Sequence, residues 1–203
     1  MLNLPLLLAS ASPRRHELLN QAGIPHTVVH IPAPPGEDEP QLDGESAIAY
    51  VQRTADDKLI QADDYLRSQQ ADAEHAILCA DTTVELHGTI LAKPIDATDA
   101  KHMLQSLSGQ RHHVHTAVAL LLNGKVYRAL STSTVHMKAL SEAEIIQYCA
   151  SKEPMGKAGA YGIQGRAGVF VQHLEGSYSG VMGLPLYETY QLLQEAGLLS
   201  YRA

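Results

Sequence analysis

The sequence predicts an α/β fold in which a mixed β-sheet is flanked by helices. An apolar run at Leu6–Leu8 suits a buried strand and passes directly into a helical pattern, which is typical of strand–helix units. Further along, Asn123-Gly124 separates two apolar runs and is the strongest short hairpin signal in the chain. Hairpins mixed with strand–helix units favour a sheet that contains parallel and antiparallel pairs and is covered by helices.

The first part of the chain predicts two strands and two helices, with a polar loop between them. Ser12 is a good N-cap and Pro13 a good first helical residue, so a helix should follow the first strand. Pro, Asp and Glu crowd the stretch Ile31–Gly44 and indicate a loop. The expected elements are a strand at Pro5–Ser10, a helix to Ala22, a strand at His26–His30 and a helix from Ser46 to about Gln69, whose apolar face is Ile48, Val51, Ala55, Leu59, Ala62 and Leu66.

The rest of the chain predicts two hairpins and several shorter elements. Ala76–Ala80 is a compact apolar strand that is expected to end at Asp81, and His87-Gly88 marks a turn. Ser141-Glu142-Ala143-Glu144 is a capping-box pattern, which begins a helix. The expected elements are hairpin strands at Thr83–Leu86 and Thr89–Leu91, a helix from Asp96 to Ser106, hairpin strands at Val114–Leu122 and Lys125–Met137, a helix to Cys149, a glycine-rich loop at Lys157–Gly168, a strand at Val169–Leu174 and a helix from Pro185 to Ala196.

Length, charge and cysteine content limit the classes of protein. The 203 residues suit one domain spanning 1–203, which can form two lobes around a central cleft. The formal net charge of −7 excludes a general affinity for DNA or RNA, because that binding rests on clustered positive charge. Two cysteines far apart, no run of transmembrane length and no basic stretch before the first apolar run predict a cytoplasmic protein without a membrane partner.

The segment Ser10-Ala11-Ser12-Pro13-Arg14-Arg15 carries the clearest sign of a ligand. A helix N-terminus offers free N–H groups and a partial positive charge. Two arginines beside it suit a phosphate group. The alternative is a capped surface helix with two solvated arginines, and this segment alone leaves both interpretations open.

Two further residues suit chemistry on a phosphate. Asp81 comes where a buried strand is expected to end, a place where α/β proteins position ligands and catalytic groups. It is therefore a candidate general base or metal ligand, and the alternative is a cap of the next turn. Lys93-Pro94 precedes the capped helix at Asp96, which makes Lys93 a candidate phosphate ligand or, alternatively, a solvated lysine.

The glycine-rich segment Lys157–Gly165 interleaves flexible backbone with polar side chains. Glycines let the backbone approach a ligand closely. Gln164 suits hydrogen bonds to the edge of a base because its amide both donates and accepts. Tyr161 can pack on a base or a sugar, and the alternative is a glycine-rich turn with Tyr161 in the core.

Two other clusters point less clearly to function. His113 and His115 would share one face of a strand, but together with His112 they lack the further ligand that a zinc site needs. Ordinary strand and turn histidines are therefore favoured. The acidic stretch Glu37–Glu39 is either solvated or contributes one metal ligand.

Taken in order, these segments resemble the Maf family of nucleotide pyrophosphatases. The resemblance spans nearly the whole chain at family-like spacing. The motifs that carry it are Ser10–Arg15, Ala80-Asp81-Thr82, Lys93-Pro94, Ser108-Gly109 with His112 and Thr116, Glu153-Pro154, Lys157–Gly165 and Gly183-Leu184-Pro185.

The resemblance implies a fold, an activity and roles for individual residues. The family has a mixed α/β sheet related to the inosine-triphosphate pyrophosphatases, and it hydrolyses nucleoside triphosphates between the α- and β-phosphates to the monophosphate and pyrophosphate. Asp81 carries over as the proton acceptor, and Thr82 with Gln164 resembles the dTTP/UTP branch. The implied phosphate-binding residues are Ser12, Arg14, Arg15 and Lys93, to which we add Lys157, while Arg14, Thr82 and Gln164 stand at positions that distinguish subgroups by substrate.

A divalent cation, Mg²⁺ or Mn²⁺, is expected as the cofactor. An unperturbed aspartate has a pKa of about 3.9 and is a weak base towards bulk water. A bound metal lowers the pKa of water and bridges phosphate oxygens. The candidate metal ligands are Asp81 and, in the acidic stretch, Glu39.

The expected partner is a small-molecule nucleoside triphosphate, and a homodimer is left open. Two alternatives to the dTTP/UTP enzyme stay open: a 7-methyl-GTP or inosine-triphosphate pyrophosphatase on the same scaffold, and a nucleotide-binding regulator of cell division. The sequence favours an enzyme because a candidate base, Asp81, accompanies the phosphate cations, whereas a pure binder would need only the cations.

Overall fold

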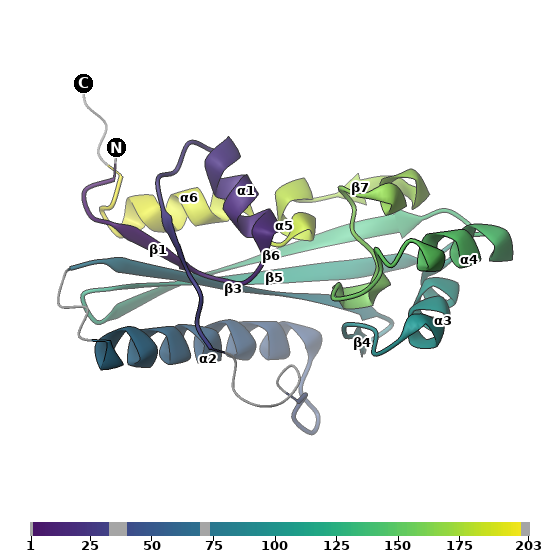
Figure 1. The fold of residues 1–203 in the computed structure, drawn as a ribbon, viewed down its shortest axis with the longest axis horizontal. Helices are drawn as coiled ribbons and strands as arrows, with labels where there is room; N and C mark the ends of the chain where they lie inside the picture. Colours follow the sequence, from purple (N-terminus) through teal and green to yellow (C-terminus); the bar gives the residue numbers. More distant parts are fainter. Residues whose placement is uncertain (1, 33–39, 70–73, 200–203) are drawn as a thin grey trace.

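A computed structural model describes residues 2–32, 40–69 and 74–199. In these residues a mixed sheet of seven strands has the order β2-β1-β3-β5-β6-β7, with β4 on an edge of β3 (Figure 1). β1 pairs in parallel with β2 and β3, and the other pairs are antiparallel, so the predicted mixed sheet is confirmed. The strands are β1 Leu6–Ala9, β2 Thr27–Val29, β3 Ala76–Leu86, β4 Thr89–Leu91, β5 Arg111–Leu122, β6 Lys125–Met137 and β7 Val171–Glu175.

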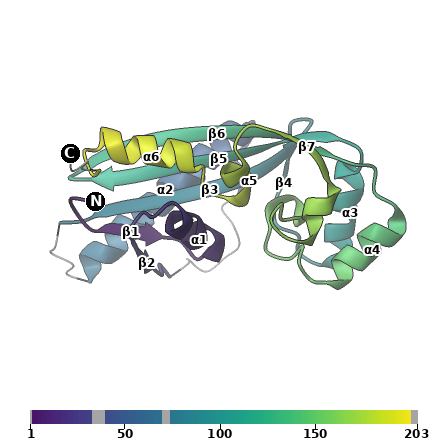
Figure 2. The ribbon, with the colours of Figure 1, turned by 90° about the horizontal axis from the view of Figure 1, so that it is seen from above.

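Helices cover both faces of the sheet and one end of it. α2 packs along one face against β3 and β5, and α1, α5 and α6 cover the opposite face (Figure 1). α3, α4 and the 3-10 helices lie together at one end of the sheet (Figure 2). The helices are α1 Pro13–Gln21, α2 Ala47–Ser68, α3 Ala97–Leu107, α4 Glu142–Ala150, η1 Ala158–Ala160, η2 Arg166–Phe170, α5 Tyr178–Met182 and α6 Leu186–Glu195.

β3 is longer than the sequence predicts. It continues through Asp81 because β5 pairs with it along almost its whole length, so the prediction that the strand ends at Asp81 is wrong. Two strands share its other edge. β1 pairs with that edge as far as Leu78 and β4 from Val84 onward, so between these residues no strand of the described chain covers it.

α2 begins as predicted, and its buried face carries one polar residue. Ser46 Oγ accepts a hydrogen bond from Ala49 N at 3.2 Å and caps the helix. The predicted apolar face is buried except for Ile48, which lies in the first turn and is 42% exposed. Thr54 is 1% exposed on the buried side of the helix, although the sequence pattern did not select it.

The two hairpin turns and the capping box are confirmed. His87-Gly88 has φ angles of 52° and 82°, and Asn123-Gly124 has 50° and 75°, which is the left-handed backbone that tight hairpin turns need. Ser141 Oγ accepts from Glu144 N, while Glu144 Oε2 accepts from Ser141 N at 2.8 Å.

Three features of the fold differ from the predicted elements. β5 begins at Arg111 rather than Val114, so the three clustered histidines belong to a strand. β7 begins at Val171 rather than Val169, because η2 occupies the preceding residues. α5 was not predicted, because a single helical turn leaves too short a periodic pattern.

The core lies between the sheet and its covering helices and is mainly aliphatic. Leu8, Leu78 and Leu120, from three strands, are fully buried, and Leu193 of α6 covers them from one side. None of the helices in the described parts of the chain combines the length and apolarity needed to cross a bilayer.

Gly159 in η1 tests how closely the glycine-rich segment packs on β3. Its φ is +65°, and an added Cβ would lie 2.9 Å from Val84 Cγ1. Gly159→Ala should lower the free energy of unfolding by about 2–5 kcal/mol, because left-handed backbone and overpacking add. The control Gly23→Ala has the same φ but meets no atom within 4 Å. It should cost about 1–2 kcal/mol in urea denaturation. Equal losses for the two variants would contradict the close packing.

Candidate functional site

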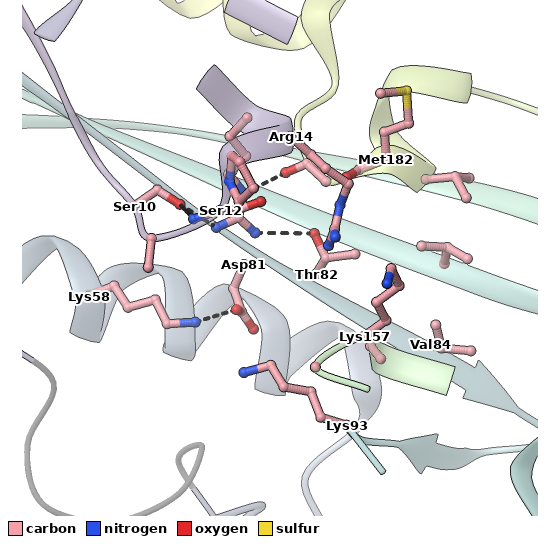
Figure 3. A pocket seen from close by; sticks show the side chains of 18 of the residues that line it. Ser10, Ser12, Arg14, Lys58, Asp81, Thr82, Val84, Lys93, Lys157 and Met182 are labelled. Atoms are coloured by element: carbon pink, nitrogen blue, oxygen red, sulfur yellow. Dashed lines mark hydrogen bonds and ion pairs between the residues drawn. The ribbon is translucent and has the colours of Figure 1, made fainter. Parts of the chain in front are cut away.

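A cavity of about 510 Å³ lies at the part of the β3 edge that β1 and β4 leave uncovered. Its walls come from the β1–α1 junction, α2, β3, the glycine-rich segment and α5 (Figure 3). Five cationic side chains line it, and among the described residues a single carboxylate does so. These are Arg14, Arg15, Lys58, Lys93 and Lys157, with Asp81 as the carboxylate.

The start of α1 supplies two arginines that backbone carbonyls after α5 hold in place. Arg14 Nε donates to Met182 O at 3.2 Å, and Arg15 Nε donates to Gly183 O at 2.7 Å. Burial lowers the pKa of Arg14. Burial also lowers the pKa of Arg15; the nearby Asp81 carboxylate acts to raise that pKa, and the nearby Arg14 charge acts to lower it. The alternative of two solvated arginines is therefore wrong, and both guanidinium groups bear the cost of partial desolvation.

Thr82 belongs to a chain of hydrogen bonds whose direction is fixed. Thr116 Oγ1 donates its only proton to Gly180 O at 2.8 Å, so Thr82 Oγ1 must be the donor in its 3.0 Å contact with Thr116. Thr82 Oγ1 then accepts from Arg15 Nη2 at 3.4 Å. The proton of the Thr82 hydroxyl therefore points towards the buried Thr116, and the hydroxyl helps to hold Arg15.

Two side chains from one face of α2 contact the two carboxylate oxygens of Asp81. Lys58 Nζ forms an ion pair with Asp81 Oδ1 (Figure 3). Thr54 Oγ1 donates to Asp81 Oδ2 at 2.7 Å. Thr54 and Lys58 are four residues apart and therefore lie one turn apart on one face of the helix. The Asp81 side chain is 15% exposed.

Lys58 is a cavity residue that the sequence reasoning missed. It follows Asp56-Asp57 in the middle of an amphipathic helix, where a charged residue is typical of a solvated face. Nothing in the local pattern separates it from such residues. Only the packing of α2 on β3 brings its ammonium group to Asp81.

The other predicted phosphate residues also reach the cavity. Ser12 lies at the N-cap of α1 without capping through its side chain, and its N–H donates to Ser10 Oγ at 3.2 Å. Lys93 lines the cavity from the segment after β4, and Lys157 lines it from the glycine-rich segment (Figure 3). Burial lowers the pKa of Lys157, as does Arg14, and Glu153 raises it.

Glu153 orders the glycine-rich segment around its own carboxylate. Its Oε1 accepts from Tyr148 Oη at 3.2 Å, and its Oε2 accepts from Arg166 N at 3.1 Å. Its backbone carbonyl accepts from Lys157 Nζ. A Cβ at Gly165 would clash with the Glu153 carboxylate, which would have to move and give up these hydrogen bonds.

Of the other residues predicted for the site, Tyr161 lines the cavity and Gln164 does not. Tyr161 lines the cavity, is 6% exposed and shares a hydrogen bond of 2.7 Å with His112 Nε2. Gln164 is exposed and is not among the lining residues, so the structure does not bring it to the other predicted residues. Glu39, with the rest of Glu37–Glu39, lies outside the described residues.

The histidine cluster makes contacts within the sheet. His113 Nδ1 and His115 Nε2 lie 3.3 and 3.4 Å from Glu85 Oε2. Within residues 2–32, 40–69 and 74–199, no group of three His, Cys, Asp or Glu side chains is arranged to hold a metal ion. His113 and His115 thus contact Glu85 on the neighbouring strand β3.

The fold and the cavity define an α/β protein with a cationic pocket that surrounds one aspartate. Residues 5–196 match a family model described as Maf-like protein. The chain therefore belongs to the Maf family.

The chain is also similar to individual proteins. A protein of Bordetella pertussis named dTTP/UTP pyrophosphatase is 58% identical over 193 residues, which cover 95% of this chain and 93% of that protein. One of the same name from Chromobacterium violaceum is 48% identical over 192 residues, covering 95% and 94%. A crystal structure of a nucleoside-triphosphatase, dITP/XTP pyrophosphatase, from Mycobacterium abscessus aligns with a TM-score of 0.42 and 14% identity, over 98% of this chain and 100% of that one. That structural likeness is too low to bear on function.

His112 should make the stability of the fold depend on pH. It is 1% exposed, and its pKa is lowered to about 4, chiefly by burial and to a smaller extent by His113 and His136. The unfolded chain binds a proton at this residue below about pH 6.5, whereas the folded chain does not until about pH 4. Stability should therefore fall as the pH falls through this window, by about 2 kcal/mol between pH 7 and pH 5 from this residue.

His112→Gln, which keeps a hydrogen-bonding group for Tyr161, should flatten this pH dependence in urea denaturation. The same exchange at His102, which is exposed on α3, should leave it unchanged. An equal loss of stability with falling pH in wild type and His112→Gln would show that His112 is not the source.

Proposed function

We propose that this protein is a nucleoside triphosphate pyrophosphatase that hydrolyses dTTP and UTP to the monophosphate and pyrophosphate. The observation that carries the proposal is the Asp81 carboxylate in a cavity lined by five cationic side chains. Cations alone would suffice to bind a polyanion. A carboxylate among them adds a group that can accept a proton from water. The names of the Bordetella and Chromobacterium relatives support the same reaction.

The chemistry of the cavity wall suggests how the nucleotide lies. Lys58, Asp81 and Ser12 stand towards one side of the cavity (Figure 3). Val84 and Met182 stand towards the other side, where Lys157 lies beside Val84 (Figure 3). We place the triphosphate at the side of Lys58 and Asp81, where charge-assisted hydrogen bonds are available. The base lies at the more apolar side, which Tyr161 also lines.

Asp81 acts as the base in this reaction. Within residues 2–32, 40–69 and 74–199, Lys58 and Thr54 each donate to one oxygen of the carboxylate, and such an oxygen can accept about two hydrogen bonds. Asp81 orients a water and takes its proton while the water oxygen bonds to the α-phosphorus. The bond from that phosphorus to the bridging oxygen breaks, and pyrophosphate leaves with the electron pair. Arg14, Arg15 and Lys93 stabilise the charge on the phosphates.

We also propose that a divalent cation binds at Asp81 together with the nucleotide. Mg²⁺ commonly binds through one or two carboxylates, with water and substrate phosphates as its other ligands. Asp81 would supply the carboxylate, since the described residues offer no self-sufficient metal cluster. When bound, Mg²⁺ or Mn²⁺ neutralises phosphate charge and lowers the pKa of a coordinated water. Glu39, the other predicted ligand, lies outside the described residues.

The preference for dTTP and UTP is supported by the relatives' names more than by side chains that face a base. Arg14 and Thr82 both line the cavity, but the Thr82 hydroxyl directs its proton towards Thr116 and accepts a hydrogen bond from Arg15. Gln164 is exposed, so its base-reading role has no support from the described geometry and stays a prediction. The 7-methyl-GTP or inosine-triphosphate enzyme and the regulator of cell division are not favoured by these names.

The cellular compartment is also a proposal. Cys79 and Cys149 are both free thiols, which supports a reducing compartment such as the cytoplasm. The single domain over 1–203 and the homodimer stay predictions, and the substrate is a small molecule in either case.

Asp81→Asn should lower kcat for dTTP by about 10²–10⁴-fold, because the amide keeps the shape but cannot take the proton. Pyrophosphate release at saturating dTTP and Mg²⁺ measures the effect. Asp64→Asn, the same exchange on an exposed part of α2, should leave kcat unchanged. Near-normal turnover by Asp81→Asn would refute the assignment of the base.

Release of pyrophosphate and orthophosphate from dTTP, UTP, CTP, GTP, 7-methyl-GTP and ITP tests the function itself. We expect pyrophosphate, fastest from dTTP and UTP, with turnover abolished by EDTA and restored by Mg²⁺ or Mn²⁺. Preference for 7-methyl-GTP or ITP would keep the reaction and overturn the specificity. Binding without turnover of any nucleotide would favour the regulator.

A further inference from the structure

The geometry points to Thr54 as a positioning residue that holds the Asp81 carboxylate in its catalytic orientation. Its Oγ1 lies 2.7 Å from Asp81 Oδ2, across the interface of α2 with β3. This inference rests on the proposed function, because it gives Thr54 a part in the same hydrolysis. Thr54 was selected by no sequence motif, and it lies on the buried side of α2 among apolar residues.

The Thr54 hydroxyl has a single proton, and Asp81 is the strongest of the three acceptors within its reach. Thr54 Oγ1 also lies 3.0 Å from Tyr50 O and 3.2 Å from Val51 O, but a hydroxyl has one proton to donate. The two carbonyls belong to α2 and are the acceptors of its own backbone ladder. An ionised carboxylate is the stronger acceptor. The Thr54 proton therefore goes to Asp81.

The bond fixes an orientation that the Lys58 contact alone does not fix. Lys58 is a flexible side chain, 38% exposed, and it holds only Oδ1. Thr54 is 1% exposed and sits in the core, and a threonine in a helix has two preferred χ1 angles, so its hydroxyl has far less freedom than the Lys58 ammonium group. With one rigid and one mobile donor on its two oxygens, the carboxylate plane is set by Thr54.

Thr54 acts on Asp81 without contacting the substrate. It is not among the residues that line the main cavity, but it lines an adjoining cavity of about 40 Å³. The residues that line both cavities are Lys58, Asp81, Thr82, Lys93 and Ala158. Loss of its hydroxyl should therefore impair the chemical step and leave nucleotide binding nearly unchanged. If Thr54 served only in packing, loss of its methyl group would impair the protein, and loss of its hydroxyl would not.

Two substitutions separate these roles. Thr54→Val keeps the shape and removes the hydroxyl, whereas Thr54→Ser keeps the hydroxyl and removes the methyl group. Steady-state pyrophosphate release from dTTP with Mg²⁺ should show kcat about 10-fold or more below wild type for Thr54→Val, with KM within about twofold. Thr54→Ser should keep kcat within about threefold of wild type.

A matched control is available in α6. Thr189 is fully buried, and its Oγ1 has no hydrogen-bond partner among the described residues. Thr189→Val makes the same exchange in a buried helix position away from the cavity, and it should turn over dTTP like wild type. If Thr54→Val does not give a folded protein, Thr54→Ala is measured instead, with the same loss of kcat expected.

The inference is overturned if the variant without the hydroxyl keeps wild-type kcat, if Thr54→Ser loses as much as Thr54→Val, or if KM rises as much as kcat falls. Each of these results leaves the proposed function intact as long as wild type releases pyrophosphate. Failure of wild type to release pyrophosphate from any nucleotide in the panel would overturn the proposed function, and the role of Thr54 with it.

Discussion

The uncovered stretch of the β3 edge is the constraint on which the site depends. β1 runs parallel to β3 and leaves it after Leu78, while β4 folds back onto it only from Val84. The chain leaving β1 turns at once into α1, which brings Arg14 and Arg15 to this gap. Because the residues between the two partners keep strand geometry through their pairing with β5, Asp81 and Thr82 point to opposite faces of a rigid strand.

The cavity is rich in positive charge, although the chain as a whole carries a negative net charge. The protein carries a formal charge of −7, yet the described residues that line the cavity include five cations and one carboxylate. Partial burial disfavours the charged forms of Arg14, Arg15 and Lys157, whose pKa values are lowered. A polyanion that enters this cavity relieves the repulsion among them, so the same arrangement that costs folding free energy favours binding of phosphates.

The sequence predicted the elements well where a local rule decides them. The turns at His87-Gly88 and Asn123-Gly124 and the capping box at Ser141 depend on a few adjacent residues, and they were found. The end of β3 was misplaced because pairing with β5, a contact between distant segments, carries the strand through Asp81.

The same distinction explains the candidate site. Arg14, Arg15, Asp81, Lys93 and Lys157 were selected from motifs and do line the cavity. Lys58 and Thr54 were missed because their importance comes from the face of α2 that meets β3, where a lysine and a threonine carry no local signal. Gln164 was selected for its chemistry, but the backbone of the glycine-rich segment leaves it exposed.

The decisive measurement is a crystal structure of the protein with Mg²⁺ and α,β-imido-dTTP, which resists cleavage at the α–β bridge. We expect the α-phosphate next to the Asp81 carboxylate, the β- and γ-phosphates on Arg14, Arg15 and Lys93, and the base towards Val84 and Met182. A nucleotide bound with its phosphates away from Asp81, or with its base towards Lys58 and Ser12, would contradict the proposed mechanism.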